Sequence, residues 1–259
     1  MNIPNVQFNN GKVIPILGLG TYDLRGKSGI IAMKHAIELG YRHFDTATLY
    51  KNEEEVGKAI RDSGINRNQF FVTTKIWSSD LGYNSSKIAF QESFDRLKLE
   101  YIDLYLIHWP NNTKINRIQT WKSMEELVEE GLIKSIGVSN FSITQVQEIL
   151  NICEIKPVIN QIHLNPFNND HNLINYCKDN EIVIEAYTPL EKGRYFDHEF
   201  IQQLSTKYHK SPAQIFLRWC VDNNYVTIPK SANKNRIKEN ADIFDFQIDI
   251  KDLDKLNEL

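Results

Sequence analysis

Residues 102–139 read IDLYLIHWPNNTKINRIQTWKSMEELVEEGLIKSIGVS. The segment opens with an almost uninterrupted apolar run at 102–109. In 116–130 apolar side chains recur at helical spacing, and Gly131 follows as a helix stop. A second apolar run, rich in Ile and Val, occupies 133–139. The segment therefore predicts a strand, a helix and a second strand, which is the pattern of a parallel α/β protein.

The same alternation continues along the chain. Further apolar runs lie at 41–45, 70–75, 157–162, 182–187 and 225–229, with an eighth candidate at 14–20. Nearly continuous apolar strands are typical of parallel sheets that are covered on both faces. No GxGxxG motif follows a strand, which disfavours an open dinucleotide-binding sheet, and eight units in 259 residues match the usual size of a closed barrel. We therefore predict an α/β fold, a (β/α)8 TIM barrel in one domain that spans residues 1–259.

Local signals refine this prediction. The apolar spacing in 30–39 predicts a helix that ends at Gly40. Ser142 with Gln145, and Ser211 with Pro212 and Gln214, read as capping boxes that open two further helices. An Asn-Gly pair lies between two short extended runs in VQFNNGKVIPI, residues 6–16, and predicts a β-hairpin that plugs one end of the barrel.

Composition excludes several classes of protein. The formal net charge of −3 and the pI near 6.2 give no sign of a nucleic-acid partner. Cys153, Cys177 and Cys220 are far apart and form no metal-binding spacing, so we expect no metal and a reducing compartment. The first residues contain no apolar signal region, and no run approaches the ~18 apolar residues of a membrane helix. We expect a cytoplasmic protein with no membrane partner, and a monomer because no exposed apolar stripe is evident.

Polar side chains mark the ends of strands that are otherwise apolar. In a (β/α)8 barrel the carboxyl ends of the strands meet at one mouth, where active sites are built. We therefore expect these strand-end residues to converge there: Asp45, Lys75, His108, Ser139, Asn140, Gln161, Tyr187, Lys230 and Ser231.

Four of the residues near this mouth suggest a reaction. Tyr50 follows Asp45 by five positions, in a segment with neither a strand pattern nor a helical face. A nearby Lys75 ammonium would stabilise the phenolate and lower the pKa of Tyr50, and Asp45 would be the anionic partner of that ammonium. His108 would orient a carbonyl oxygen by hydrogen bonding. This set suits carbonyl reduction, in which a proton reaches an oxygen that gains negative charge.

The remaining strand ends suit the nicotinamide that such a reaction requires. Asn140 and Gln161 offer amide groups to a carboxamide, and the Tyr187 ring offers a stacking surface. After the last strand, Lys230, Ser231 and Arg236 gather near a helix start, which is a pattern of anion sites.

The chain resembles the aldo-keto reductases from the N-terminal hairpin almost to its end. The motifs that carry the resemblance are GLGTY (18–22), GYRHFDTATLYKNE (40–53), TKIW (74–77), LIHWP (106–110), GVSNF (137–141), NQIHLNP (160–166), AYTPL (186–190) and IPKSANKNRIKEN (228–240). All of them occur in the family's order, and an NADPH-dependent reductase of aldehydes and some ketones is what the resemblance implies.

The resemblance also implies roles for individual residues. Tyr50 matches the catalytic acid, Lys75 and Asp45 the pair that tunes it, and His108 the substrate-orienting histidine. Substrate contacts would come from Tyr22, Tyr50, Trp77, His108 and Trp109. Cofactor contacts would come from Ser139, Asn140 and Gln161 at the carboxamide, Tyr187 at the ring, Thr21 and Asp45 at the ribose, and Leu190 at the pyrophosphate. Lys230, Ser231 and Arg236 would contact the 2′-phosphate, Glu239 and Asn240 would lie beside the adenine, and Thr188 would be a further cofactor contact.

Departures from the family pattern limit what carries over. Position 22 is Tyr where many animal members have Trp, and AYTPLEKG replaces the more frequent AYSPLG. The chain ends at KDLDKLNEL, without the long C-terminal loop of larger relatives, so we expect an open site that tolerates many aldehydes. Glu191, Lys192 and Arg194 have no family counterpart and receive no role.

Two other functions compete with reduction. One is a non-catalytic NADPH-binding sensor subunit, although an intact set of Asp45, Tyr50, Lys75 and His108 disfavours it. The other is an isomerase or aldolase that forms a Schiff base on Lys75, although Asp45 would hold that amine protonated.

Overall fold

Eight parallel strands form one sheet in the computed structural model, which describes residues 3–111 and 113–259. Met1, Asn2 and Asn112, which belong to the predicted domain, lie outside the described residues. The strands pair in chain order and are β3 (Leu19–Gly20), β4 (His43–Asp45), β5 (Phe71–Ile76), β6 (Ile102–Ile107), β7 (Ile133–Ser139), β8 (Ile159–His163), β9 (Val183–Tyr187) and β10 (Val226–Thr227).

The sheet closes on itself where the first strand meets the last. Leu17 bridges Thr227 in parallel, just before β3. The Gly18 N–H donates to Thr227 O at 2.9 Å, and the Thr227 N–H donates to Ile16 O at 2.8 Å. These bonds join the two edges, so the prediction of a (β/α)8 barrel is confirmed.

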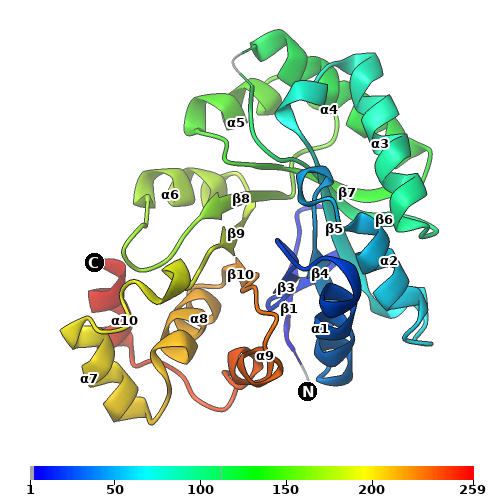
Figure 1. The fold of residues 1–259 in the computed structure, drawn as a ribbon. Helices are drawn as coiled ribbons and strands as arrows, with labels where there is room; N and C mark the ends of the chain where they lie inside the picture. Colours follow the sequence, from blue (N-terminus) through cyan, green and yellow to red (C-terminus); the bar gives the residue numbers. More distant parts are fainter. Residues whose placement is uncertain (1–2, 112) are drawn as a thin grey trace.

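Helices surround the barrel (Figure 1). They are α1 (Gly26–Glu38), α2 (Glu53–Arg61), α3 (Tyr83–Leu97), α4 (Lys114–Glu129), α5 (Ile143–Leu150), α6 (His171–Asp179), α7 (Glu199–Tyr208), α8 (Pro212–Asp222), α9 (Lys234–Ala241) and α10 (Ile250–Asn257). Both predicted capping boxes are present, at Ser142 with Gln145 and at Ser211 with Gln214. No helix in the described part of the chain is long and apolar enough to span a membrane.

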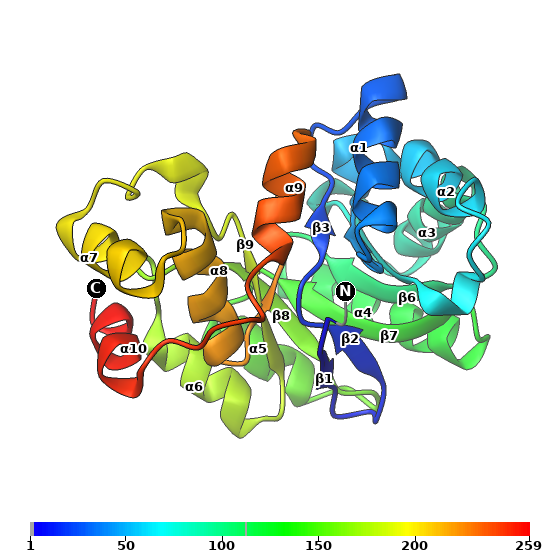
Figure 2. The ribbon, with the colours of Figure 1, turned by 90° about the horizontal axis from the view of Figure 1, so that it is seen from below.

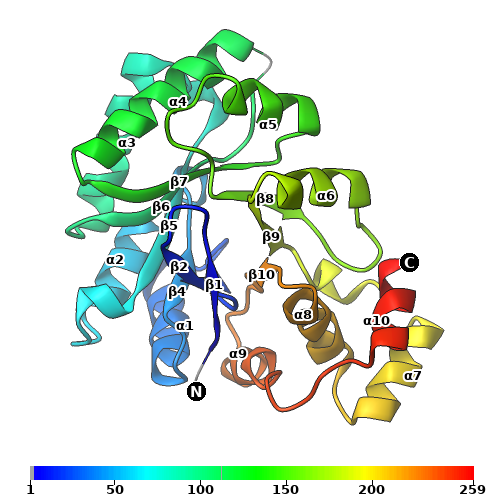
Figure 3. The same cartoon turned by 180° about the vertical axis from the view of Figure 1, so that it is seen from behind.

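The predicted N-terminal hairpin is present and covers one end of the barrel. Strand β1 (Asn5–Gln7) pairs antiparallel with β2 (Val13–Pro15), and Gly11 in the turn has a φ of +79°. The hairpin lies at one end of the molecule in Figure 2 and across the centre of the ring of helices in Figure 3. Its Phe8 and Ile14 are buried in one apolar cluster with Leu104 of β6 and Val158, which directly precedes β8.

The hairpin changes one predicted strand. The apolar run at 14–20 divides, because its first residues belong to β2 and only Leu19–Gly20 form the barrel strand β3. The division follows from Gly18, where an added Cβ would lie 2.4 Å from the buried His43 ring. Only a glycine lets the chain pass this close to β4 as it enters the barrel.

Candidate active site

The predicted strand-end residues lie at or just beyond the carboxyl ends of the barrel strands. Asp45, Ser139 and Tyr187 are the last residues of β4, β7 and β9. Lys75 is the last residue but one of β5, and His108 follows β6 directly. Because the strands are parallel, these side chains share one end of the barrel, opposite the hairpin.

A buried ion pair lies at the centre of this end. Lys75 Nζ is 2.5 Å from Asp45 Oδ1 and donates a second hydrogen bond to Thr46 O at 2.9 Å. Burial is the largest single influence and would lower the pKa of Lys75, but Asp45, with contributions from Tyr50 and Glu185, reverses that effect, so the pKa of Lys75 is raised and the amine stays an ammonium. Thr21 contacts the backbone of Asp45, because the Thr21 hydroxyl donates a hydrogen bond to Asp45 O at 2.8 Å.

Tyr50 ends a short 3₁₀ turn, Thr48–Tyr50, between β4 and α2. The turn is fastened from both sides. Arg25 Nε donates to Tyr50 O at 3.0 Å, and the buried Asn52 side chain accepts from Thr46 Oγ1 at 2.7 Å. This bracing places the Tyr50 ring 5.0 Å from Lys75 Nζ, measured to the ring centroid.

The acidity of Tyr50 differs from the expectation from sequence. Burial raises the pKa of Tyr50 above its ordinary value, and the Lys75 ammonium only partly offsets that rise. The lowered pKa expected from Lys75 alone is therefore wrong in net direction, because the sequence does not reveal how deeply the phenol is desolvated. The phenol is accordingly protonated at neutral pH, the form that donates a proton.

His108 is a neutral imidazole. Burial, together with the nearby Lys75 charge, lowers the pKa of His108 to about 3. Its ring contacts the Tyr50 ring edge-on at 5.6 Å between centroids, and the Trp77 ring at 5.1 Å. Tyr22 extends this aromatic row, with its ring 5.2 Å from that of Tyr50. Of the predicted substrate contacts, Trp109 stands apart from the row and is 47% exposed.

Ser139, Asn140, Gln161 and Tyr187 form a second group beside the ion pair. The Asn140 amide is largely occupied, because its Nδ2 donates to His108 O and to Ser139 Oγ, each at 3.0 Å, and its Oδ1 accepts from Tyr187 Oη at 2.8 Å. Asn140 has a φ of +61°, a conformation that asparagine tolerates better than most residues. Gln161 Nε2 donates to Asp45 Oδ2 at 2.9 Å, which ties this group to the ion pair.

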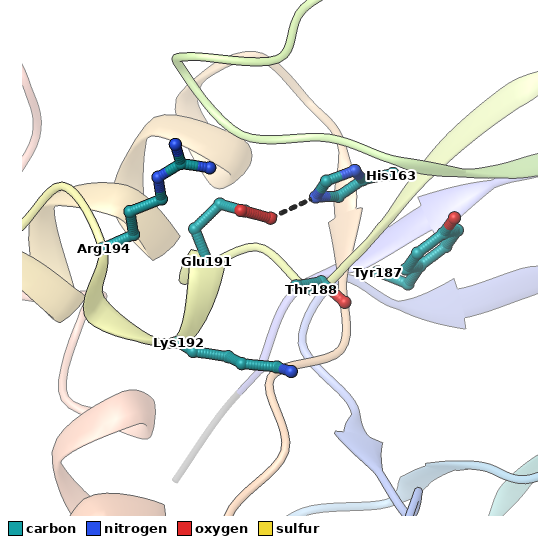
Figure 4. A pocket seen from close by; sticks show the side chains of 6 residues that line it. All are labelled: His163, Tyr187, Thr188, Glu191, Lys192 and Arg194. Atoms are coloured by element: carbon teal, nitrogen blue, oxygen red, sulfur yellow. Dashed lines mark hydrogen bonds and ion pairs between the residues drawn. The ribbon is translucent and has the colours of Figure 1, made fainter.

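A cavity of about 510 Å³ opens next to Tyr187 (Figure 4). Its lining residues are His163, Tyr187, Thr188, Glu191, Lys192 and Arg194. His163 Nε2 lies 2.5 Å from Glu191 Oε1, and the His163 ring is stacked on the Tyr187 ring at 5.6 Å. Thr188, Glu191 and Lys192 have φ values of +52°, +43° and +54°, so the segment after β9 winds sharply around this cavity.

The remaining predicted cofactor residues lie after β10 and on α9. Lys230 and Arg236 are exposed, and neither takes part in an ion pair among the described residues. Ser231, Glu239 and Asn240 are buried or half-buried near them. Asn233 caps α9 through hydrogen bonds from the N–H groups of Asn235 and Arg236. Leu190 is half-buried against the main core.

Sequence reasoning missed four residues of this region. Glu185 and His43 are fully buried inside the barrel, with Glu185 Oε1 3.7 Å from His43 Nε2. His163 and Glu191 line the cavity beside Tyr187. For Glu185 the sequence held only a partial signal. Alternate residues of a barrel strand point inward, but the sequence does not say which alternate set does.

Comparisons with known proteins identify the family and agree with the fold. The model of the Aldo/keto reductase family matches residues 17–259. A glyoxal reductase from Bacillus subtilis is 44% identical over 255 residues, which covers 98% of this chain and 92% of that protein. The crystal structure of an aldo/keto reductase from Brucella melitensis superposes with a TM-score of 0.96 at 42% identity and covers 99% of both chains. A Bombyx mori aldo-keto reductase in complex with NADP gives a TM-score of 0.92 at 38% identity, covering 100% of this chain and 93% of that one.

Proposed function

This chain belongs to the aldo/keto reductase family, and from that membership we propose that it reduces aldehydes and some ketones to alcohols with NADPH as its cofactor. The observation that carries the proposal is a chain of contacts from the buried Asp45 carboxylate to Lys75, from Lys75 to the Tyr50 ring and from that ring to His108. A phenol, an ammonium and a neutral imidazole suit proton delivery to a carbonyl oxygen that gains negative charge.

The neighbouring residues fit a nicotinamide. Gln161 offers a carbonyl oxygen and Ser139 a hydroxyl hydrogen, the complements of the amino and carbonyl groups of a carboxamide. The half-buried Tyr187 ring offers a stacking surface beside the cavity. When bound, the nicotinamide supplies the hydride that reduces the carbonyl carbon. Its presence in a related structure with NADP supports the same assignment.

In this proposal each catalytic side chain has one task. His108, neutral because of its burial, donates an N–H hydrogen bond that orients the carbonyl oxygen. Tyr50 then gives that oxygen its hydroxyl proton, as the O–H bond of the phenol breaks and the O–H bond of the alcohol forms. The Lys75 ammonium, held protonated by Asp45, stabilises the phenolate that remains.

We propose short aldehydes and dicarbonyls as the substrate class. Tyr22 is 54% exposed and Trp109 is 47% exposed, which favours an open, aromatic entrance. A relative 44% identical to this chain is a glyoxal reductase. Glyoxal and methylglyoxal are accordingly the first substrates to test.

The test is NADPH consumption across a panel of short aldehydes, dicarbonyls and ketones. We expect turnover by the wild type, and for Tyr50→Phe a loss of about 10²- to 10⁴-fold in kcat, the usual contribution of a general acid. Binding of NADPH, followed by fluorescence, should be nearly unchanged in that variant. Tyr22→Phe is the matched control, because it removes a phenol hydroxyl from the same aromatic row.

Each alternative function gives a different result. A wild type that binds NADPH but oxidises it with no carbonyl would favour the non-catalytic sensor. Trapping of substrate on Lys75 by borohydride would favour Schiff-base chemistry. A Tyr50→Phe variant that keeps most of its kcat would remove Tyr50 from the role of acid.

A further inference from the structure

Glu185 is a fully buried acid that the reaction described above does not use. It lies in the middle of β9 and points into the barrel, where its side chain is 0% exposed. Its Oε2 accepts a hydrogen bond from Gln161 Nε2 at 2.8 Å. The same nitrogen donates to Asp45 Oδ2 at 2.9 Å, so two carboxyl groups share one side-chain amide.

This arrangement fixes which way the Gln161 amide faces. A primary amide nitrogen has two hydrogens, and Asp45 and Glu185 take one each. In the reversed orientation the amide carbonyl oxygen would face the Asp45 carboxylate, which has no hydrogen to donate, and that hydrogen bond would be lost. Gln161 is only 1% exposed, so water does not replace that bond.

The fixed orientation leaves one atom of Gln161 available. Neither hydrogen bond uses Oε1. Buried side-chain atoms without a partner in the described part of the chain include Glu185 Oε1 and Tyr105 Oη, but not Gln161 Oε1. Gln161 Oε1 is therefore accessible from outside the protein, although the rest of the side chain is almost completely buried.

We propose that Glu185 is a positioning residue that, together with Asp45, holds Gln161 so that Oε1 accepts a hydrogen bond from the amino group of the nicotinamide carboxamide. The inference rests on the proposed function and extends it to a residue that does not itself touch the cofactor. Asp45 alone can hold one hydrogen of the amide, whereas Glu185 holds the second and makes the orientation unique.

The charge state of Glu185 supports this role. Burial, reinforced by the nearby Asp45 carboxylate, raises the pKa of Glu185 to about 8. The His43 ring on its other side is neutral, because burial lowers the pKa of His43 to about 3. At neutral pH Glu185 is thus an uncharged acceptor, and the Lys75 ammonium has a single carboxylate to balance.

The test compares two nucleotides that differ only at the group in question. NADP⁺ has a carboxamide amino group, and its 3-acetylpyridine analogue has a methyl group in that place. Dissociation constants for both are measured by calorimetry in the wild type, in Glu185→Gln, which keeps an accepting oxygen, and in Glu185→Met, which has a similar length and no strong acceptor.

We expect the wild type and Glu185→Gln to bind NADP⁺ more tightly than the analogue by about three- to tenfold, the usual worth of one hydrogen bond. In Glu185→Met the two dissociation constants should become nearly equal. General damage to the barrel would weaken both nucleotides alike and leave their ratio at the wild-type value. Should Glu185→Met fail to fold by circular dichroism, Glu185→Ala carries the same comparison.

The outcomes separate this inference from the proposed function. If the wild type binds neither nucleotide, the proposed function fails and the inference falls with it. If the wild type prefers NADP⁺ and Glu185→Met or Glu185→Ala keeps the full preference, the proposed function stands and Glu185 does not position Gln161. Loss of the preference in Glu185→Gln as well would also overturn the inference, because that variant retains the acceptor.

Discussion

At the scale of single residues, the described part of the barrel interior contains one ion pair among several other buried ionisable side chains. Lys75 pairs with Asp45 at 2.5 Å, and both side chains are almost completely buried. Removing one partner of such a pair leaves an uncompensated charge away from water, which costs far more than the net value of the pair. Both the stability of the fold and the proposed chemistry therefore depend on this pair.

Asp45→Asn tests this dependence. We expect the free energy of unfolding to fall by about 3–5 kcal/mol, because the Lys75 ammonium loses its counter-ion in the barrel interior. Urea titration at pH 7 gives the value. Asp62→Asn is the control: its exposed carboxylate pairs with Lys34 and Lys58 on the surface, and its loss should leave the stability nearly unchanged. Equal stability of Asp45→Asn and the wild type would refute the claim.

Glu185 gives a prediction for pH. Because the pKa of Glu185 is raised to about 8 from its ordinary value of 4.5, the folded protein keeps a proton that the unfolded chain releases between these values. Folding stability contributed by this group is full below the lower value and is lost as pH rises toward the upper one. Glu185→Gln has no such group, so its stability relative to wild type should increase from pH 5 to pH 8.

Urea midpoints at three pH values across this window measure the difference. Asp45, Lys75 and His43, the other ionisable groups around Glu185, are present in both proteins, so their own titration largely cancels. A constant stability difference between the two proteins would show that Glu185 has an ordinary pKa.

The sequence was informative for residues that interrupt an apolar pattern. Asp45, Lys75 and His108 stand at strand ends, and the structure places them at one mouth as expected. Glu185 lies inside the apolar run 182–187, where a single polar letter does not say whether it points into the barrel. The net acidity of Tyr50 was also out of reach, because desolvation depends on packing between segments distant in sequence.

At the scale of elements, the start of α9 carries the proposed discrimination between nucleotides. Asn233 satisfies the first N–H groups of the helix, and the exposed Lys230 and Arg236 add two cations near it. A phosphate is bound most strongly by an arginine in two-point contact. In the proposed function these cations would bind the 2′-phosphate, which NADPH has and NADH lacks.

Arg236→Ala should therefore raise the KM for NADPH at least tenfold and leave the KM for NADH nearly unchanged, a loss of at least about 1.4 kcal/mol for the phosphate contact. Steady-state kinetics with both cofactors measure this. Lys238→Ala, which removes an exposed cation from the same helix, is the matched control. A parallel rise in both KM values would assign Arg236 to the general integrity of the site.

Most helices and strands were predicted from local sequence signals, and two segments were not. The capping boxes at Ser142 and Ser211 opened their helices as predicted. Helix α1, in contrast, begins at Gly26, ahead of the apolar spacing that starts at Ile30, because its first turn is exposed. The winding of residues 188–193 had no local signal, since three of its left-handed residues are not glycine.

At the scale of the whole molecule, the hairpin and the proposed active site lie at opposite ends of the barrel. Phe8 of the hairpin packs against Phe71 of β5, while the exposed Tyr22 ring lies against Tyr50 at the other end. The two ends can therefore be perturbed separately.

Phe8→Ala should lower the free energy of unfolding by about 3–5 kcal/mol, because a buried ring is removed. Its kcat/KM for a short aldehyde should stay near the wild-type value at a temperature where the variant is folded. Tyr22→Ala should do the reverse, with a lower kcat/KM and nearly unchanged stability. Thermal unfolding and initial rates on the same samples provide the comparison, and a shared loss in both variants would contradict the separation.

The seam of the barrel also has a consequence for the order of events during synthesis. Leu17 meets Thr227 across the closure, a contact between residues roughly 200 positions apart. The first strand therefore waits for the last one to leave the ribosome before it gains its second neighbour. Asp45 and Lys75 are made early, but Gln161 and Glu185 reach them late. Enzyme activity in a nascent chain would thus report completion of the barrel rather than the appearance of Tyr50, the proposed catalytic acid.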